Sequence, residues 1–366
     1  MEKKVNIPLS KVYVDKEIKN AVIKALESGR YILGEKVREF EQKFAVFCHV
    51  KHAVCTSSGT AAIFLALKAL DIKPKDEIIV PSFSFIATAS PVLHVGAKPV
   101  FAEINLRNYT LDPDDMKRKI SKKTKGIIPV HLYGHPVDMD PILEIANEND
   151  LFVIEDAAQA HGAEYKGRRV GGIGGISCFS FYPSKNMTVC GDGGIITTNN
   201  EKIAEKIRML RNHGRWEKYT HEVIGYNLRF NEMQASIGIK QLEKLPSWNK
   251  ARRKIAQIYN RTIDDPVVTP IEEQWAKHVY HMYVIRTEKR DDLQKFLERQ
   301  GISTGIHYPI PIHKQPAIES ILGRQPPLRN SELAARTVLS LPMYPQLTLG
   351  EIEYVCAKIK DFFKKA

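Results

Sequence analysis

The chain has 366 residues, of which 43% are hydrophobic and 26% are charged, and its formal net charge is +12. This length is too great for one small core and suits a large α/β domain with a smaller second domain. Its five cysteines are widely spread without a C-x-x-C pair, which argues against a zinc or redox centre and favours a reducing cytoplasm. The basic residues occur in short scattered groups without a nucleic-acid-binding motif, so we predict no nucleic acid partner; an anionic, phosphate-bearing ligand is compatible with the charge.

Membrane insertion is not expected. The longest apolar stretch, residues 61–67, is far too short to span a bilayer. The first residues alternate charged and apolar side chains and contain no apolar core of a signal peptide. We therefore expect a soluble cytoplasmic protein with no membrane partner.

Short apolar runs alternate with helical patterns over about two thirds of the chain, which is typical of a mostly parallel sheet covered by helices. Apolar residues at helical spacing predict helices at residues 60–70 and 201–210. Pro129 lies inside one apolar run and indicates a strand end or an irregularity there. The seven strands that we predict are residues 53–55, 78–80, 98–101, 126–132, 152–154, 178–181 and 195–198.

The pattern changes near Pro246, where a long charged helix is predicted through residue 259. A strand, a helix, a proline-rich loop and a last helix follow, at residues 281–286, 291–300, 307–313 and 349–363. We predict a large domain of residues 1–245 and a smaller α+β domain of residues 246–366, with the N-terminal segment free to pack on the smaller one. The loop that begins at His307 is long and rich in reactive side chains, which favours a functional role.

Lys185 lies in the segment Ser-Phe-Tyr-Pro-Ser-Lys-Asn of residues 180–186, between an apolar run and a glycine-rich turn. The hydroxyl of Ser180, at the exit of a buried strand, can hold a phosphate while the amine of Lys185 reaches a carbonyl of the same small molecule. Pyridoxal phosphate is such a molecule. Most lysines are solvated surface residues, so this segment alone does not establish a cofactor site.

The segment Ser57-Ser58-Gly59-Thr60 follows a short strand and opens a helix. Its free backbone N–H groups and the positive end of the helix dipole form an anion site that suits the cofactor phosphate. The alternative is an ordinary helix N-cap by Ser57 or Ser58, which this stretch by itself favours.

Asp156 stands at the carboxyl end of the apolar run 152–154, where ligands bind in open α/β sheets. There it can pair with the pyridinium nitrogen and keep it protonated, although an acidic residue that merely ends a strand is common. Gln159 lies beside the ring if a turn or helix starts after Asp156. Phe85, soon after the strand 78–80, can place an aromatic face on the ring, and core packing is the alternative for it.

Taken together, these segments resemble the DegT/DnrJ/EryC1/StrS family of sugar aminotransferases, from about residue 7 to the last helix. Each segment is weakly diagnostic, whereas the set in this order is specific. The matching segments are Ser58-Gly59-Thr60, residues 81–89, residues 129–134, residues 155–160, residues 180–186, residues 191–194, residues 225–229 and His307-Tyr308-Pro309.

The resemblance implies a fold-type I aminotransferase that depends on pyridoxal 5′-phosphate and forms a homodimer with shared active sites. It implies ping-pong transfer of an amino group from L-glutamate to a nucleotide-linked keto-sugar, with a 3-keto sugar favoured and a 4-keto sugar possible. The product is then an amino sugar of a surface polysaccharide, a glycan or a glycosylated metabolite.

The resemblance also implies roles for single residues. Lys185 forms the Schiff base with the cofactor, and Asp156 pairs with the ring nitrogen. Gln159 lies near the ring hydroxyl. The remaining implied contacts are Ser58, Gly59, Thr60 and Ser180 at the phosphate, Asn227 from the neighbouring subunit at the same phosphate, Phe85 on the ring, and Arg229, His307 and Tyr308 near the substrate.

Other functions stay open at this stage. One branch of the family replaces the lysine by histidine and acts as a sugar dehydratase, and a regulator that binds the cofactor without catalysis is a further alternative. A dehydrogenase is disfavoured because the glycines of residues 171–175 lead into a strand instead of opening a helix. A metal site is not expected, because Pro136 follows the pair His131 and His135 and the glutamate of H-E-x-x-H is missing.

Overall fold

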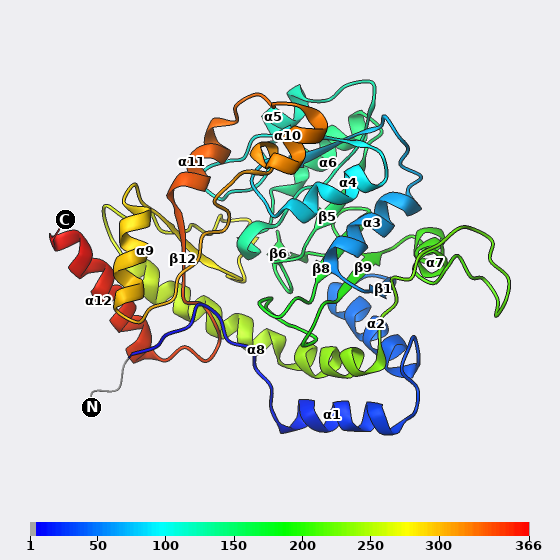
Figure 1. Cartoon of the computed structure of the whole chain (residues 1–366), viewed down its shortest axis with the longest axis horizontal. Helices are drawn as coiled ribbons and strands as arrows, with labels where there is room; N and C mark the ends of the chain where they lie inside the picture. Colours follow the sequence, from blue (N-terminus) through cyan, green and yellow to red (C-terminus); the bar gives the residue numbers. More distant parts are fainter. Residues whose placement is uncertain (1–4, 366) are drawn as a thin grey trace.

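The computed structural model describes residues 5–365 and is built around a seven-stranded sheet (Figure 1). Its strand order is β1-β9-β8-β5-β4-β2-β3, and only β9 runs antiparallel to its neighbours. The mostly parallel sheet confirms the predicted fold class. The strands are β1 (His52–Thr56), β2 (Glu77–Pro81), β3 (Lys98–Ala102), β4 (Thr124–Ile127), β5 (Phe152–Asp156), β8 (Ile176–Ser180) and β9 (Gly194–Thr198).

Strand β4 ends earlier than the predicted strand 126–132, because Pro129 has no N–H group for a strand ladder. Pairing with β5 resumes beyond the proline, where Asp156 N donates to Pro129 O at 2.9 Å and His131 N donates to Asp156 O at 3.0 Å. This irregular segment therefore lies against the carboxyl end of β5.

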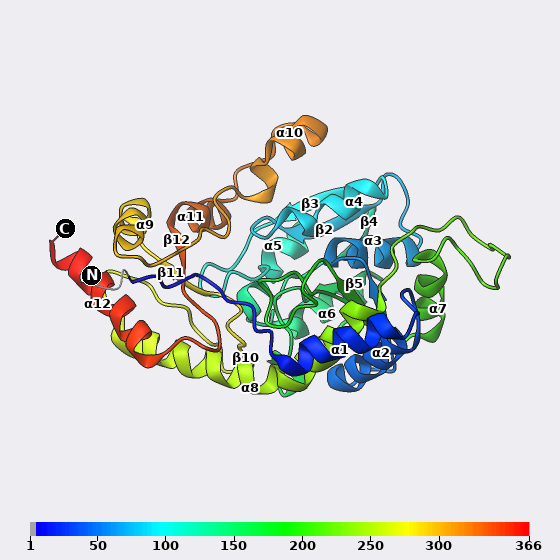
Figure 2. The same cartoon turned by 60° about the horizontal axis from the view of Figure 1, so that its bottom comes forward.

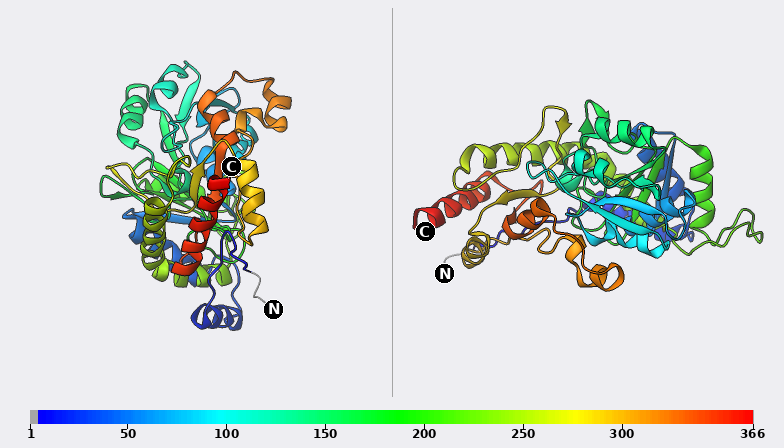
Figure 3. Two further views of the ribbon diagram at one scale, coloured as in Figure 1. Left: turned by 90° about the vertical axis from the view of Figure 1, so that its left-hand side faces the viewer. Right: turned by 90° about the horizontal axis from the view of Figure 1, so that it is seen from above.

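Helices cover both faces of the sheet and enclose two apolar cores (Figure 3). On one face, α2 contributes Phe40 and Phe44 and α6 contributes Ile142. On the other face, α3 contributes Leu65 and α7 contributes Ile207. The helices of this part are α2 (Glu35–Cys48), α3 (Gly59–Ala69), α4 (Ser90–His94), α5 (Pro113–Arg118), α6 (Met139–Glu148) and α7 (Glu201–Leu210).

Helix α8 (Glu232–Thr262) has 31 residues and extends from α2 to the C-terminal part of the molecule (Figure 1). The prediction that this helix starts near residue 246 was wrong: Pro246 lies inside it, and Asn231 caps its N-terminus by accepting from Gln234 N at 2.8 Å. The first half of α8 packs in the apolar core that includes Phe40 and Phe44 of α2. Ile255 and Tyr259, in its second half, pack in a third core in the C-terminal part. We propose that the large and small domains share this helix.

The C-terminal part is built on the antiparallel pair of β11 and β12, which forms a third core with α8 and α12. The N-terminal segment packs on it, because Ile7 pairs with Gly301 and Ser303 and Leu9 O accepts from Met343 N at 3.0 Å. No helix within residues 5–365 is long and apolar enough to cross a membrane. The elements are β10 (Ala276–Lys277), β11 (Tyr283–Arg286), β12 (Val338–Leu341), α9 (Arg290–Arg299), α10 (Pro316–Leu322), α11 (Arg329–Thr337) and α12 (Leu349–Lys365).

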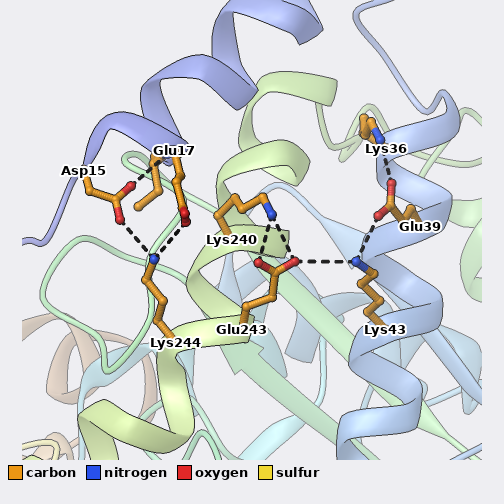
Figure 4. Close-up of polar contacts among 9 residues, drawn as sticks. Asp15, Glu17, Lys36, Glu39, Lys43, Lys240, Glu243 and Lys244 are labelled. Carbon is orange, nitrogen blue, oxygen red and sulfur yellow. Dashed lines mark hydrogen bonds and ion pairs between the residues drawn. The ribbon is translucent and has the colours of Figure 1, made fainter.

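Helix α1 (Lys16–Glu27) lies alongside α8 (Figure 2). Lys244 of α8 holds the start of α1, with its Nζ atom 3.0 Å from carboxylate oxygens of both Asp15 and Glu17 (Figure 4). Glu243 of α8 similarly pairs with Lys43 of α2 at 3.7 Å. Ion pairs near the surface are screened by solvent, so these pairs orient the helices more than they stabilise the fold.

We expect Phe44→Ala to lower the free energy of unfolding by about 3–5 kcal/mol, because Phe44 is fully buried between α2 and the sheet and truncation leaves a cavity. Val46→Ala is the matched control two residues further along the same helix, where the side chain is 75% exposed. Urea unfolding followed by circular dichroism measures both. Equal stability of the two variants would contradict this assignment of the core.

Candidate active site

A cavity of about 490 Å³ opens at the carboxyl ends of the parallel strands. It is lined by the start of α3, the loop after β2, the ends of β5 and β8, and the loop at residues 307–308. Every predicted site residue except Asn227 and Arg229 lines this cavity: Ser58, Gly59, Thr60, Phe85, Asp156, Gln159, Ser180, Lys185, His307 and Tyr308.

Lys185 is held in a turn that follows β8, where its N–H donates to Tyr182 O at 2.9 Å. Its amine forms no hydrogen bond or ion pair with any residue that the structure describes. Burial lowers the pKa of Lys185 to about 8, although the Asp156 carboxylate acts in the opposite direction and raises it. The amine is therefore partly unprotonated near neutral pH, as a nucleophile or a general base has to be.

Asp156 is buried at the end of β5. Its Oδ2 atom accepts from the Thr88 hydroxyl at 2.8 Å, and its Oδ1 atom accepts from Ala158 N at 3.2 Å. Burial raises the pKa of Asp156 above its usual value, and Thr88, Ala158 and Lys185 oppose this rise. A buried carboxylate with so few donors favours a cationic hydrogen-bond donor beside it.

Thr88 is a site residue that the sequence analysis missed. It lies in the short 3₁₀ helix η1 (Ile86–Thr88), is 1% exposed, and is joined to Ser84 Oγ at 2.9 Å. In the segment after β2, the sequence analysis assigned a site role to Phe85 and none to Thr88. A hydroxyl three positions after Phe85 was the available signal, but its partner Asp156 lies 68 positions away in the chain.

Gln159 links the end of β5 to the loop of the C-terminal part. Its Oε1 atom accepts from Tyr133 N at 2.6 Å, so the amide nitrogen faces Tyr308, whose hydroxyl lies 3.2 Å from Nε2. The carbonyl of His307 accepts from the Tyr133 hydroxyl. These contacts hold the loop residues His307 and Tyr308 over the cavity.

His307 and Tyr308 are uncharged at neutral pH. Burial, and secondarily the charge of Lys185, lower the pKa of His307 to about 4, and its Nδ1 atom lies 2.9 Å from Ser340 Oγ. Burial raises the pKa of Tyr308. Both side chains therefore offer neutral hydrogen-bonding groups to a ligand.

The segment after β1 forms a cup for an anion. Ser58 caps α3 by accepting from Ala61 N at 3.1 Å, so the N-cap expected as the alternative is present. The N–H groups of Gly59 and Thr60 have no acceptor within the described residues and remain available to a ligand. A Cβ atom at Gly59 would lie 2.7 Å from Cβ of Ser180, so only glycine allows these two segments to meet.

Phe85 is 54% exposed although it lines the cavity, and its ring centroid lies 5.7 Å from that of Tyr308. An open aromatic face of this kind suits stacking on a planar ligand.

Asn227 and Arg229 do not reach the cavity of their own chain. They are joined to each other, because Arg229 Nε donates to Asn227 Oδ1 at 2.9 Å. Both lie on the segment between the extended loop after α7 and the start of α8.

Glu155, next to Asp156, belongs to a separate buried network that the sequence analysis also missed. Its Oε1 atom accepts from the N–H groups of Ile173 and Gly174 at 3.0 and 2.7 Å, and Oε2 lies 2.9 Å from His131 Nε2. Burial by itself would raise the pKa of Glu155, but these partners lower it. The glycine-rich segment 171–175 therefore binds a carboxylate of the protein, and β8 follows it directly.

The cavity fits pyridoxal phosphate. The free N–H groups of Gly59 and Thr60, the buried carboxylate of Asp156 and the amine of Lys185, whose pKa is lowered, all line the same cavity. Together with the mostly parallel sheet, this arrangement defines a fold-type I enzyme that depends on pyridoxal phosphate. No group of three or more His, Cys, Asp or Glu side chains within residues 5–365 is arranged to hold a metal ion.

The model of the DegT/DnrJ/EryC1/StrS aminotransferase family matches residues 12–360. The chain therefore belongs to this family and is a pyridoxal-phosphate-dependent transaminase.

Named relatives agree with this membership. The chain is 44% identical to the dTDP-3-amino-3,4,6-trideoxy-alpha-D-glucose transaminase of Streptomyces venezuelae, over 94% of this chain and 92% of the relative. It is 43% identical to a pleiotropic regulatory protein of Geobacillus stearothermophilus, over 98% and 99% of the two chains. The solved structure of S. venezuelae DesV in complex with a ketimine intermediate superposes with a TM-score of 0.93 at 40% identity, covering 98% of each chain.

We expect Gly59→Ala to weaken pyridoxal phosphate binding about tenfold or more, because the added methyl group pushes the start of α3 away from Ser180. Gly350→Ala is the control, since a Cβ atom there meets nothing within 4 Å. Fluorescence titration of the apoenzymes with the cofactor measures both. Equal affinity in the two variants would show that the cup does not hold the phosphate.

We also expect the amine of Lys185 in the apoenzyme to become reactive with a midpoint near pH 8. Because its pKa is lowered, the amine is unprotonated above that pH, whereas a fully solvated lysine stays protonated up to about pH 10.4. Acylation with a trace reagent at a series of pH values, read by peptide mass spectrometry, gives the midpoint. The exposed Lys122 serves as the reference site. A midpoint above pH 10 for Lys185 would contradict the burial effect.

Proposed function

We propose that the protein transfers the amino group of L-glutamate to a nucleotide-linked keto-sugar, with the ketone at C3 favoured over C4. The observation that carries this proposal is the pairing of Lys185 and Asp156 in one cavity with a free amide cup. The name of the Streptomyces relative, a transaminase of a 3-amino sugar, supports the sugar class and the C3 position. Such an enzyme serves the synthesis of amino sugars for surface polysaccharides, glycans or glycosylated metabolites.

Each cofactor-binding residue takes a role that its position suits. Gly59, Thr60 and Ser180 hold the phosphate, with Ser58 fixing the helix start. Asp156, oriented by Thr88, would accept a hydrogen bond from the ring nitrogen and so keep that nitrogen protonated. The remaining contacts are Gln159 near the ring hydroxyl and Phe85 on the ring face.

Lys185 is the residue that moves the proton in both half-reactions. When bound, pyridoxal phosphate supplies an aldehyde for amine exchange and a ring that takes up electron density. The Nζ atom of Lys185 accepts the proton from Cα of the amino donor, and it delivers a proton to the sugar carbon in the second half. Its pKa of about 8 suits both directions, because neither protonation state is strongly favoured near neutral pH. One amine donor and one keto-sugar thus use one cavity in turn, which gives ping-pong kinetics.

The substrate side of the cavity is formed by His307 and Tyr308. Since both are neutral, they can bind sugar hydroxyl groups without attracting a second anion. Arg229 is placed with the substrate residues on the resemblance alone, and it would act from another chain because it lies outside this cavity.

We propose a homodimer in which Asn227 and Arg229 act in the partner's active site. The extended loop after α7 projects from the molecule (Figure 2) and carries exposed apolar side chains, among them Trp216 and Ile224. An exposed apolar surface of this kind is typical of a protein contact. A second copy of the chain would cover it and would bring the missing amide to the phosphate cup.

Two other activities remain less favoured. A regulator that only binds the cofactor has the named Geobacillus relative in its support, but it has no need of an amine with a lowered pKa opposite a buried carboxylate. A sugar dehydratase of the same fold carries histidine at the lysine position, and residue 185 is lysine.

The proposal is tested by incubating the purified protein with pyridoxal phosphate, L-glutamate and a panel of nucleotide-linked 3-keto and 4-keto sugars. We expect 2-oxoglutarate and an amino sugar in equal amounts, with the 3-keto sugars preferred. Lys185→Ala should lower turnover at least about 10³-fold. Asp156→Asn should lower it about 10²–10³-fold without changing the circular dichroism spectrum.

Each part of the proposal would be contradicted by a different result. Full turnover by Lys185→Ala removes the catalytic assignment. Conversion of the cofactor to its amine form by another amino acid but not by glutamate would contradict glutamate as the amino donor. A preference for 4-keto sugars would contradict C3 as the position of the ketone. Failure with every keto-sugar would favour the regulator.

A further inference from the structure

A second cavity, also of about 490 Å³, lies between α8 and the small three-stranded sheet of β10, β6 (Glu164–Tyr165) and β7 (Arg168–Arg169). We call it the α8 groove. One wall is a stripe of α8 that includes Lys250, Arg253 and Lys254, and the other wall is formed by Arg169 and Lys277 of the small sheet. It shares no lining residue with the active-site cavity.

The walls of the α8 groove carry an excess of positive charge. Among residues 5–365, Glu164 is the one carboxylate that lines the groove, and it is shared between Arg169 at 3.3 Å and Lys277 at 2.9 Å. Arg253 is paired with Glu272, outside the lining. Counting both carboxylates against the five cationic side chains leaves three positive charges in excess.

Lys250 and Lys254 supply the charge that is not compensated. They stand one helical turn apart on the exposed face of α8. No carboxylate within residues 5–365 forms an ion pair with either of them. Two unpaired ammonium groups on one wall are therefore free to bind an anion.

Side-chain contacts hold the opposite wall and the floor in place. The guanidinium of Arg169 lies over the ring of Phe47 at 4.4 Å, and its Nε atom is buried without a hydrogen-bond partner. Asn249 forms part of the floor, where its Nδ2 atom donates to His161 O at 2.8 Å. Gly162 allows this close packing, because it has a φ of +82° and a Cβ atom there would lie 2.9 Å from Asn249 Nδ2.

We propose that the α8 groove is a binding site for a small phosphate-bearing anion with two or three negative charges, such as a diphosphate group. The volume is that of a small-molecule site. Ammonium groups on one wall and a guanidinium on the other match phosphate oxygens on two sides.

The α8 groove is connected to the active site. Asn249 Oδ1 accepts from Asn186 Nδ2 at 2.9 Å, and Asn186 directly follows Lys185. The floor of the groove and the segment that carries the catalytic lysine therefore share a hydrogen-bonded pair of side chains.

Binding is tested by isothermal titration of the enzyme, loaded with pyridoxal phosphate so that the phosphate cup is filled, with inorganic pyrophosphate. The groove variant is Lys250→Glu with Lys254→Glu. The control is Lys122→Glu with Lys123→Glu, which makes the same change of net charge at two exposed lysines in the loop before β4. We expect the groove variant to lose affinity about tenfold or more, the control to stay within about twofold of the natural protein, and turnover to be unchanged in both.

Three results would overturn the proposal. The first is the absence of pyrophosphate binding by the natural protein at millimolar concentration. The second is unchanged affinity in the groove variant, which would place the anion elsewhere. The third is an equal loss in the groove variant and the control, which would mean attraction by net charge alone.

Discussion

The site depends on the burial of one amine and one carboxylate in the same cavity at the carboxyl edge of the sheet. Water is withdrawn from both groups, so the pKa of Lys185 falls to about 8 and that of Asp156 rises. Their mutual attraction opposes both shifts. The cavity thus holds an amine that is ready to react and an acceptor that favours a protonated partner, and each property follows from desolvation more than from any single contact.

Strand geometry separates the side chains of Glu155 and Asp156, the two adjacent acidic residues at the end of β5. Side chains alternate across a strand, so Glu155 points to one face and Asp156 to the other. Glu155 is saturated by the glycine-rich segment and by His131, and its pKa is lowered. Asp156 has fewer donors, and its pKa is raised. One residue therefore anchors the strand end while the other remains available to a ligand.

The cavity is closed by parts of the chain that are far apart in sequence. Gln159 contacts Tyr308 over 149 positions, and the carbonyl of His307 binds Tyr133 over 174 positions. Helix α8 connects the same two parts through one continuous backbone, and it packs in the core of each. Burial in two cores is also the reason why Pro246 does not end the helix: the loss of one backbone hydrogen bond is small beside the apolar surface that both halves bury.

The sequence by itself determined the strand and helix periodicity, the glycine at residue 59, and the placement of Asp156 and Lys185 after buried strands, because each of these follows from neighbours within a few residues. Only the tertiary structure decided that Thr88 orients Asp156, that the glycine-rich segment binds Glu155, and that Arg229 lies outside the cavity of its own chain. The physical reason is the large separation in sequence between the groups that interact. A hydrogen bond between groups 68 positions apart leaves no periodic trace in the chain, because it depends on how the strands and helices pack against one another.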